Sequence, residues 1–132
     1  MPNANNFRIG STSSGEYFNG GIDEVRIWNV ARTPEQIFGS RNCELQGTDT
    51  GLVAYYKFNQ GFDAGDNAGV TTLNATTGSN GTLTNFALSS ATSNWLAGSP
   101  VTTGNTCTTL STVGFNVNSN FKIYPNPTQN EV

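Results

Sequence analysis

Asp23 and Glu24 are adjacent carboxylates, the residue type that supplies the acid and base of a glycosidase. Such an enzyme needs two carboxyl groups that face one cleft, about 5–9.5 Å apart. The alternating sequence around the two residues predicts a strand, in which neighbours point to opposite faces. We therefore expect no catalytic residue. Instead, Glu24 should pair with Arg26 on the surface, and Asp23 should accept hydrogen bonds of a turn.

The composition excludes several other kinds of chemistry. The 132 residues contain no histidine and two cysteines, so Ser-His-Asp systems, Cys-His systems and the usual zinc sites cannot form. Six basic residues occur singly in a chain of net charge -3, which argues against a nucleic-acid partner. No apolar run approaches the roughly 20 residues that a membrane span requires.

Four oxygen-bearing side chains in a glycine-rich stretch, Asn59, Asp63, Asp66 and Asn67, form a candidate calcium site. Calcium prefers oxygen ligands, but it normally takes six or more, and the spacing is not that of an EF-hand. Asp and Asn beside glycine also form ordinary turns. Calcium is the one cofactor that the sequence suggests. The alternative is that these four residues form ordinary turns.

Aromatic residues in or near predicted strands could form a platform on which sugar rings stack. These residues are Tyr17, Trp28, Tyr55, Tyr56 and Trp95. Among them, Trp28, Tyr55 and Trp95 are our candidate ligand-binding residues. The alternative is packing in the core, which is where the aromatic residues of strands more often lie.

Cys43 and Cys107 can form one disulfide, since the cysteine count is even. In the chain-entropy model, closing a loop of this length stabilises the fold by about 4 kcal/mol. Cys107 falls in a stretch rich in Thr, Ser and Asn, so both thiols could equally be free.

Period-two alternation of apolar residues predicts the elements that must position these side chains. Residues 17–30 form the longest strand-like stretch, residues 52–58 and 82–88 give further strands, and a short strand can start at Leu73. The side chains that we expect to face one core are Val25, Ile27, Ala54, Tyr56 and Phe58.

A single short helix is predicted after the first long strand. Thr33 can cap it, Pro34 suits its first position, Gln36 completes a capping box and Gly39 ends it. The fold class is therefore all-β, most simply an antiparallel sandwich, with one short helix.

Residues 17–37, which include Ile-Asp-Glu-Val-Arg-Ile-Trp-Asn at 22–29, resemble the closing segment of laminin-G-like, concanavalin A-like domains. Residues 51–58 and 81–86 are similar to the segment that accompanies this domain in large bacterial surface proteins. The resemblance implies a partial antiparallel jelly roll, because the family is usually about twice as long. It also implies a non-catalytic binding or adhesion module for a glycan or a cell-surface protein. The alternatives are an ancillary domain of a secreted hydrolase and a structural spacer.

The end of the chain carries a second resemblance. Tyr124, Pro125, Asn126 and Pro127 form the motif that opens the C-terminal sorting domain of type IX secretion cargo. The resemblance implies a secreted or cell-surface location and the type IX machinery as a partner. We expect three parts: a jelly-roll segment at residues 1–101, a Thr/Ser/Asn-rich linker at 102–120 and the truncated start of a sorting domain at 121–132.

Overall fold

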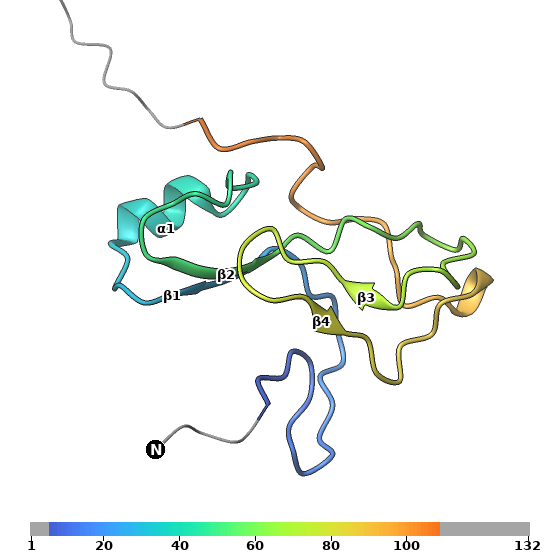
Figure 1. The fold of residues 1–132 in the computed structure, drawn as a ribbon. Coiled ribbons are helices and arrows are strands. Elements are labelled where there is room, and N and C mark those ends of the chain that lie inside the picture. Colours follow the sequence, from blue (N-terminus) through green and yellow to red (C-terminus); the bar gives the residue numbers. More distant parts are fainter. Residues whose placement is uncertain (1–5, 109–132) are drawn as a thin grey trace, which may run out of the picture.

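The computed structural model of the chain describes residues 6–108 (Figure 1). Its elements are β1 (Val25–Trp28), α1 (Pro34–Ser40), β2 (Leu52–Tyr56), β3 (Thr72–Leu73), β4 (Gly81–Thr82) and a 3-10 turn (Ser90–Thr92). Within these residues β1 pairs with β2 and β3 pairs with β4, both antiparallel. The fold is all-β with one short α-helix, as predicted.

Strand β1 is shorter than the strand predicted over residues 17–30. Glu24 has a φ of 52°, outside the extended region, so the strand begins only at Val25. Val25 then faces Tyr56, and Ile27 faces Ala54, so the inward-facing residues share one side of the sheet as predicted.

The register of this pair changes between Ile27 and Trp28, where Trp28 lies opposite Leu52 and Val53 is passed over. A one-residue shift moves a side chain to the other face of a sheet. Leu52 therefore packs in a different cluster from Tyr56, although alternation places the two on one face.

Strand β2 is bonded along both of its edges. On the edge away from β1, the Tyr55 N–H donates to the Thr77 carbonyl at 2.9 Å, and the Thr76 N–H donates to the Tyr55 carbonyl at 2.8 Å. Thr76 and Thr77 lie in the loop that joins β3 to β4. This loop thus attaches the second sheet to the first.

The larger hydrophobic cluster joins the two sheets and is built on Tyr56, Leu73 and Trp95. The side chains packed around these three are Ile9, Val25, Ala54, Phe58, Val70, Ala75, Leu83, Phe86 and Leu88. Four of the five residues predicted to face one core belong to this cluster. The fifth, Ile27, is partly buried on the same face.

A second cluster covers the opposite side of β2. It contains Leu45, Leu52 and Tyr55, with Trp28 and Cys107 packed against it. The face of β2 that carries Tyr55 is therefore covered at Tyr55, which explains why this residue is closed to solvent although it alternates with the inward-facing row, while Val53 on the same face is 42% exposed.

The strand predicted at 82–88 is limited to its first residue, because β4 ends at Thr82 and Asn85 takes a φ of 54°. The helix begins as predicted. Thr33 Oγ1 accepts from the Gln36 N–H at 3.3 Å, and Gln36 Oε1 accepts from the Thr33 N–H at 3.0 Å. It runs to Ser40, and none of its residues is buried.

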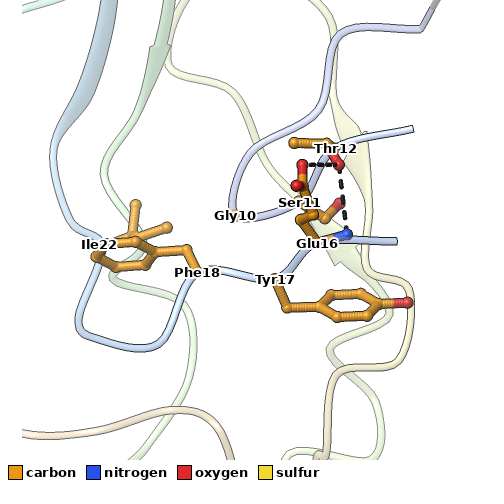
Figure 2. A pocket seen from close by; sticks show the side chains of 7 residues that line it. All are labelled: Gly10, Ser11, Thr12, Glu16, Tyr17, Phe18 and Ile22. Atoms are coloured by element: carbon orange, nitrogen blue, oxygen red, sulfur yellow. Dashed lines mark hydrogen bonds between the residues drawn. The ribbon is translucent and has the colours of Figure 1, made fainter. Parts of the chain in front are cut away.

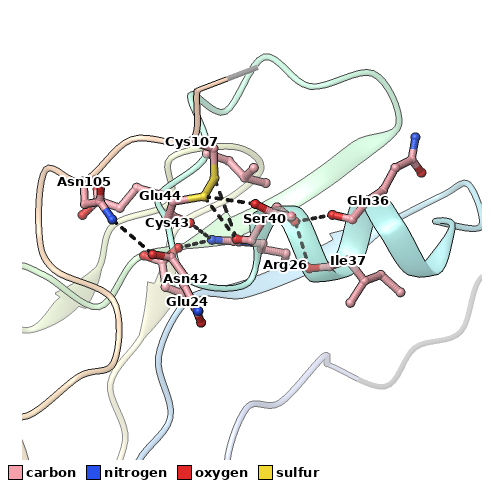
Figure 3. The surroundings of a disulfide bond; sticks show 12 residues. Glu24, Arg26, Gln36, Ile37, Ser40, Asn42, Cys43, Glu44, Asn105 and Cys107 are labelled. Carbon is pink, nitrogen blue, oxygen red and sulfur yellow. Dashed lines mark hydrogen bonds and ion pairs between the residues drawn. A yellow bond between two sulfur atoms is a disulfide. The ribbon is translucent and has the colours of Figure 1, made fainter. Parts of the chain in front are cut away.

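Residues 102–106, in the predicted linker, are exposed, but residues 104–107 are bonded to the segment that follows α1. Glu44 donates its N–H to the Asn105 carbonyl and accepts from the Cys107 N–H, at 2.8 and 2.7 Å. Cys107 forms a disulfide with Cys43 (Figure 3). The remainder of the predicted linker and the motif Tyr124, Pro125, Asn126 and Pro127 lie outside the described residues.

Candidate functional site

A charged hollow lies between β1 and α1, and we call it the arginine groove. It has a volume of about 330 Å³. Its lining residues are Asp23, Glu24, Arg26, Trp28, Arg32, Ile37, Ser40 and Arg41. Three of them are arginines and two are carboxylates, so the groove carries one net positive charge.

Arg26 lines the groove and ties three segments together (Figure 3). Its guanidinium donates to the Ser40 carbonyl at 2.6 Å, to Glu24 Oε2 at 2.5 Å and to the Cys43 carbonyl. The predicted pair of Glu24 and Arg26 is therefore present. It is not on the surface, however, because the two side chains are only 8% and 11% exposed.

Glu24 is fixed from a second side by Tyr55. The Tyr55 hydroxyl donates to Glu24 Oε2 at 2.5 Å and accepts from the Leu45 N–H at 3.1 Å. Burial raises the pKa of the Tyr55 hydroxyl well above its ordinary value, and the neighbouring Glu24 raises it further. Tyr55 therefore stays protonated and acts as a hydrogen-bond donor at neutral pH.

Two buried polar atoms beside the groove, Oε1 of Glu24 and Nε of Arg26, have no hydrogen-bond partner within residues 6–108. Buried polar atoms are nearly always bonded, so both depart from the usual pattern.

The rim of the groove carries two arginines that lie on aromatic rings. The guanidinium carbon of Arg32 is 4.1 Å from the centre of the Trp28 ring, and that of Arg41 is 3.9 Å from the centre of Phe38. Among residues 6–108 the ion pairs are Arg26 with Glu24 and Lys57 with Glu44. Arg32 and Arg41 thus have no carboxylate partner in the described part of the chain.

A second hollow, which we call the loop hollow, is formed by residues 10–22 (Figure 2). Its volume is about 430 Å³, and its lining residues are Gly10, Ser11, Thr12, Glu16, Tyr17, Phe18 and Ile22. Thr12 Oγ1 donates to Glu16 Oε2 at 3.0 Å, which fixes that carboxylate beside two hydroxyl groups. The Tyr17 ring is 71% exposed and points away from Phe18 and Ile22.

The predicted aromatic platform is wrong. Tyr55 is fully buried and Trp95 is 5% exposed, in two different clusters, so neither ring can stack on a sugar. Both rings fill the core because strands and loops cover them from two sides. Trp28 is partly buried and lies beneath Arg32. The exposed ring among the aromatic candidates is Tyr17.

The four candidate calcium ligands are not gathered at one point. Asn59 donates to Glu44 Oε1 at 2.6 Å, a partner that none of the other three bonds within residues 6–108. Asn67 is buried, and its Oδ1 accepts from the Phe62 N–H at 2.7 Å. Its amide nitrogen donates to the Phe62 carbonyl and to Ser93 Oγ.

Asp66 Oδ1 accepts from the Ala68 N–H at 3.0 Å, as in an Asx turn, while Asp63 is exposed. The turn alternative therefore describes Asp66 and Asn67. Within residues 6–108 no group of three or more acidic or cysteine side chains could hold a metal ion.

Asp23 accepts a hydrogen bond, as predicted, but from the Ser99 hydroxyl far along the chain. The sequence reasoning missed Arg32 and Arg41. Their positions could have pointed to them, because Arg32 precedes the helix cap and Arg41 directly follows the helix. Their convergence on one groove depends on how the helix packs beside β1, which no local pattern encodes.

A family model described as the concanavalin A-like lectin/glucanases superfamily matches residues 1–38. The match includes the residues of the loop hollow and all of β1, and it ends inside α1. No curated protein and no solved structure matches the chain. Within residues 6–108 no helix is long and apolar enough to cross a membrane.

Proposed function

We propose that this chain is a non-catalytic, glycan-binding module of a secreted or cell-surface protein. The observation that carries the proposal is the loop hollow, whose lining includes the exposed Tyr17, the hydroxyl residues Ser11 and Thr12 and the carboxylate residue Glu16. Aromatic rings stack on the apolar faces of sugars, and such polar groups bind sugar hydroxyls. The matching family model names lectins and glucanases, and residues 1–38 include this whole hollow.

The bonding of the carboxylates supports a binding role over hydrolysis. Glu24 is held by the Arg26 guanidinium and the Tyr55 hydroxyl, and Glu16 is held by Thr12. A general acid of a glycosidase needs a raised pKa and a partner carboxylate across a cleft.

The test compares Tyr17→Ala with Phe62→Ala, because Phe62 is equally exposed and lies outside the loop hollow. The full chain and both variants are titrated with a panel of neutral oligosaccharides by NMR. The proposal expects a ligand that shifts the amides of residues 10–22, loses affinity with Tyr17→Ala and keeps it with Phe62→Ala. It fails if no neutral oligosaccharide binds, or if both variants bind as the parent does.

An ancillary domain of a secreted hydrolase is the second candidate, favoured by the glucanases in the family description. The purified chain should release no reducing sugar from a polysaccharide panel. Release that is lost on Glu24→Gln would show that the chain is itself an enzyme.

Export is the remaining part of the proposal. A disulfide between Cys43 and Cys107 suits an oxidising compartment, and the motif at residues 124–127 resembles a type IX sorting signal. Fractionation of the native host should place the full-length protein outside the cytosol. Recovery in the cytosol with free thiols would contradict this.

A further inference from the structure

We propose that the arginine groove is a second binding site, which takes a singly charged anionic group on a sugar, namely the carboxylate of a uronate. The part of this inference that makes the ligand a glycan rests on the proposed function. It assigns a place and a chemistry separate from the loop hollow.

The charges in the groove set the charge of the ligand. Glu24 neutralises Arg26, and Asp23 offsets one of the two rim arginines, which leaves one positive charge. The groove is therefore positively charged in a chain whose net charge is -3. A monoanion neutralises the groove, whereas a dianion such as a phosphate would leave excess negative charge beside two carboxylates.

Each rim arginine lies over an aromatic ring. The guanidinium carbon is about 4 Å from the ring centre, with Arg32 on Trp28 and Arg41 on Phe38. A guanidinium that also has no carboxylate partner within residues 6–108 has N–H groups available for a carboxylate, which it can bind with two parallel hydrogen bonds. Contact with the ring also limits the motion of the side chain, so less conformational entropy is lost on binding.

The lining of the groove suits an anion that is carried by a sugar. A uronate carries hydroxyls on the same ring as its carboxylate, and the Asp23 carboxylate that lines the groove can accept hydrogen bonds from them. A volume of about 330 Å³ is at the small end of ligand pockets, which suits a single sugar unit.

The experiment titrates the full chain with trigalacturonate and with its fully methyl-esterified form, which keeps the rings and hydroxyls but loses the charge. Binding should be weaker for the ester by roughly tenfold or more, as expected for loss of charged hydrogen bonds. Arg32→Gln and Arg41→Gln should weaken binding of the acid to a similar extent. Arg8→Gln, at an exposed arginine outside the groove, should leave it unchanged.

Chemical-shift mapping on the unaltered chain keeps the test independent of how the variants fold. The acid should shift the amides of Ile37, Ser40 and Arg41. Equal affinity for acid and ester, equal weakening by Arg8→Gln, or equally tight binding of triglutamate would overturn the inference. Loss of acid binding with Tyr17→Ala would place the acid in the loop hollow and overturn it too. If the acid binds in the groove but no neutral oligosaccharide binds, the inference about the groove holds and the proposal for the loop hollow fails.

Discussion

Glu44 is a buried carboxylate that holds three separate parts of the chain together. It is 4% exposed, and it accepts from Lys57 Nζ at 2.8 Å, from the Asn59 amide at 2.6 Å and from the Gly104 N–H at 3.0 Å. Burial alone would raise the pKa of Glu44. The hydrogen bonds and the charge of Lys57 outweigh that effect and hold its pKa below the ordinary value of 4.5.

Because the pKa is lowered by folding, the ionised Glu44 stabilises the fold above about pH 4.5, and this contribution is lost as the pH falls through the folded-state pKa. We expect Glu44→Gln to lower the free energy of unfolding by about 2 kcal/mol at pH 7. Below pH 4.5 the difference from the parent should shrink. Urea denaturation from pH 3 to 7 measures both effects, with Glu16→Gln, at an exposed carboxylate, as the control.

Tyr55 and Tyr56 allow a matched comparison of two hydroxyl groups. The Tyr55 hydroxyl bonds both Glu24 and the Leu45 N–H, whereas the Tyr56 hydroxyl has a single partner within residues 6–108, the Ser79 carbonyl, to which it donates at 2.7 Å. Tyr55→Phe leaves a buried N–H and a buried carboxylate oxygen short of a partner. We expect it to cost about 2 kcal/mol and Tyr56→Phe about 1 kcal/mol. Equal losses in urea denaturation would show that the Glu24 network adds nothing to stability.

At the scale of the elements, local signals were sufficient for the start of the helix and insufficient for the strands. The cap at Thr33 and the proline at Pro34 act within one turn, so the sequence predicts the start of α1 correctly. The length of β1 depends on the backbone of Glu24, and the face of Leu52 depends on a register shift between two strands. Such contacts are distant in sequence, so alternation along one strand cannot reveal them.

Local sequence patterns were equally limited in predicting the candidate site. The pairing of Glu24 with Arg26 followed from their spacing, but its burial did not, because Tyr55 and Cys43 reach it from later in the chain. The aromatic platform failed because burial is set by the elements that cover a ring. Arg32 and Arg41 converge only when α1 lies beside β1.

The loop that follows β2 is held by a close approach of backbone to aromatic ring. A Cβ atom added at Gly61 would lie 2.2 Å from Cγ of Trp95, which is buried in the larger cluster. Gly61→Ala should therefore displace the Trp95 ring and lower the free energy of unfolding by about 2 kcal/mol. Gly69→Ala meets no atom and is the control. A red-shifted tryptophan emission should accompany the first change, and identical spectra and melting curves would contradict it.

At the scale of the whole molecule, the described residues have a small buried core. Seven hydrophobic residues among them are buried, while large side chains such as Phe7, Phe18, Phe38, Phe62 and Leu96 are at least 60% exposed. Small cores stabilise a fold weakly, and such proteins commonly depend on cross-links. In this chain the disulfide and the hydrogen bonds of Glu44 act as such cross-links, and both fasten residues 104–107 to the rest of the fold.

Removing the cross-link should therefore have a large effect. Cys43 and Cys107 are 64 residues apart, a loop for which the chain-entropy model gives about 4 kcal/mol. We expect the double variant Cys43→Ser, Cys107→Ser to unfold at a much lower urea concentration than the oxidised parent. A reducing agent should shift the parent to the same midpoint and leave the variant unchanged. If the variant and the parent instead unfold together, the bonds of Glu44 to Gly104, Asn105 and Cys107 hold the C-terminal segment without the disulfide.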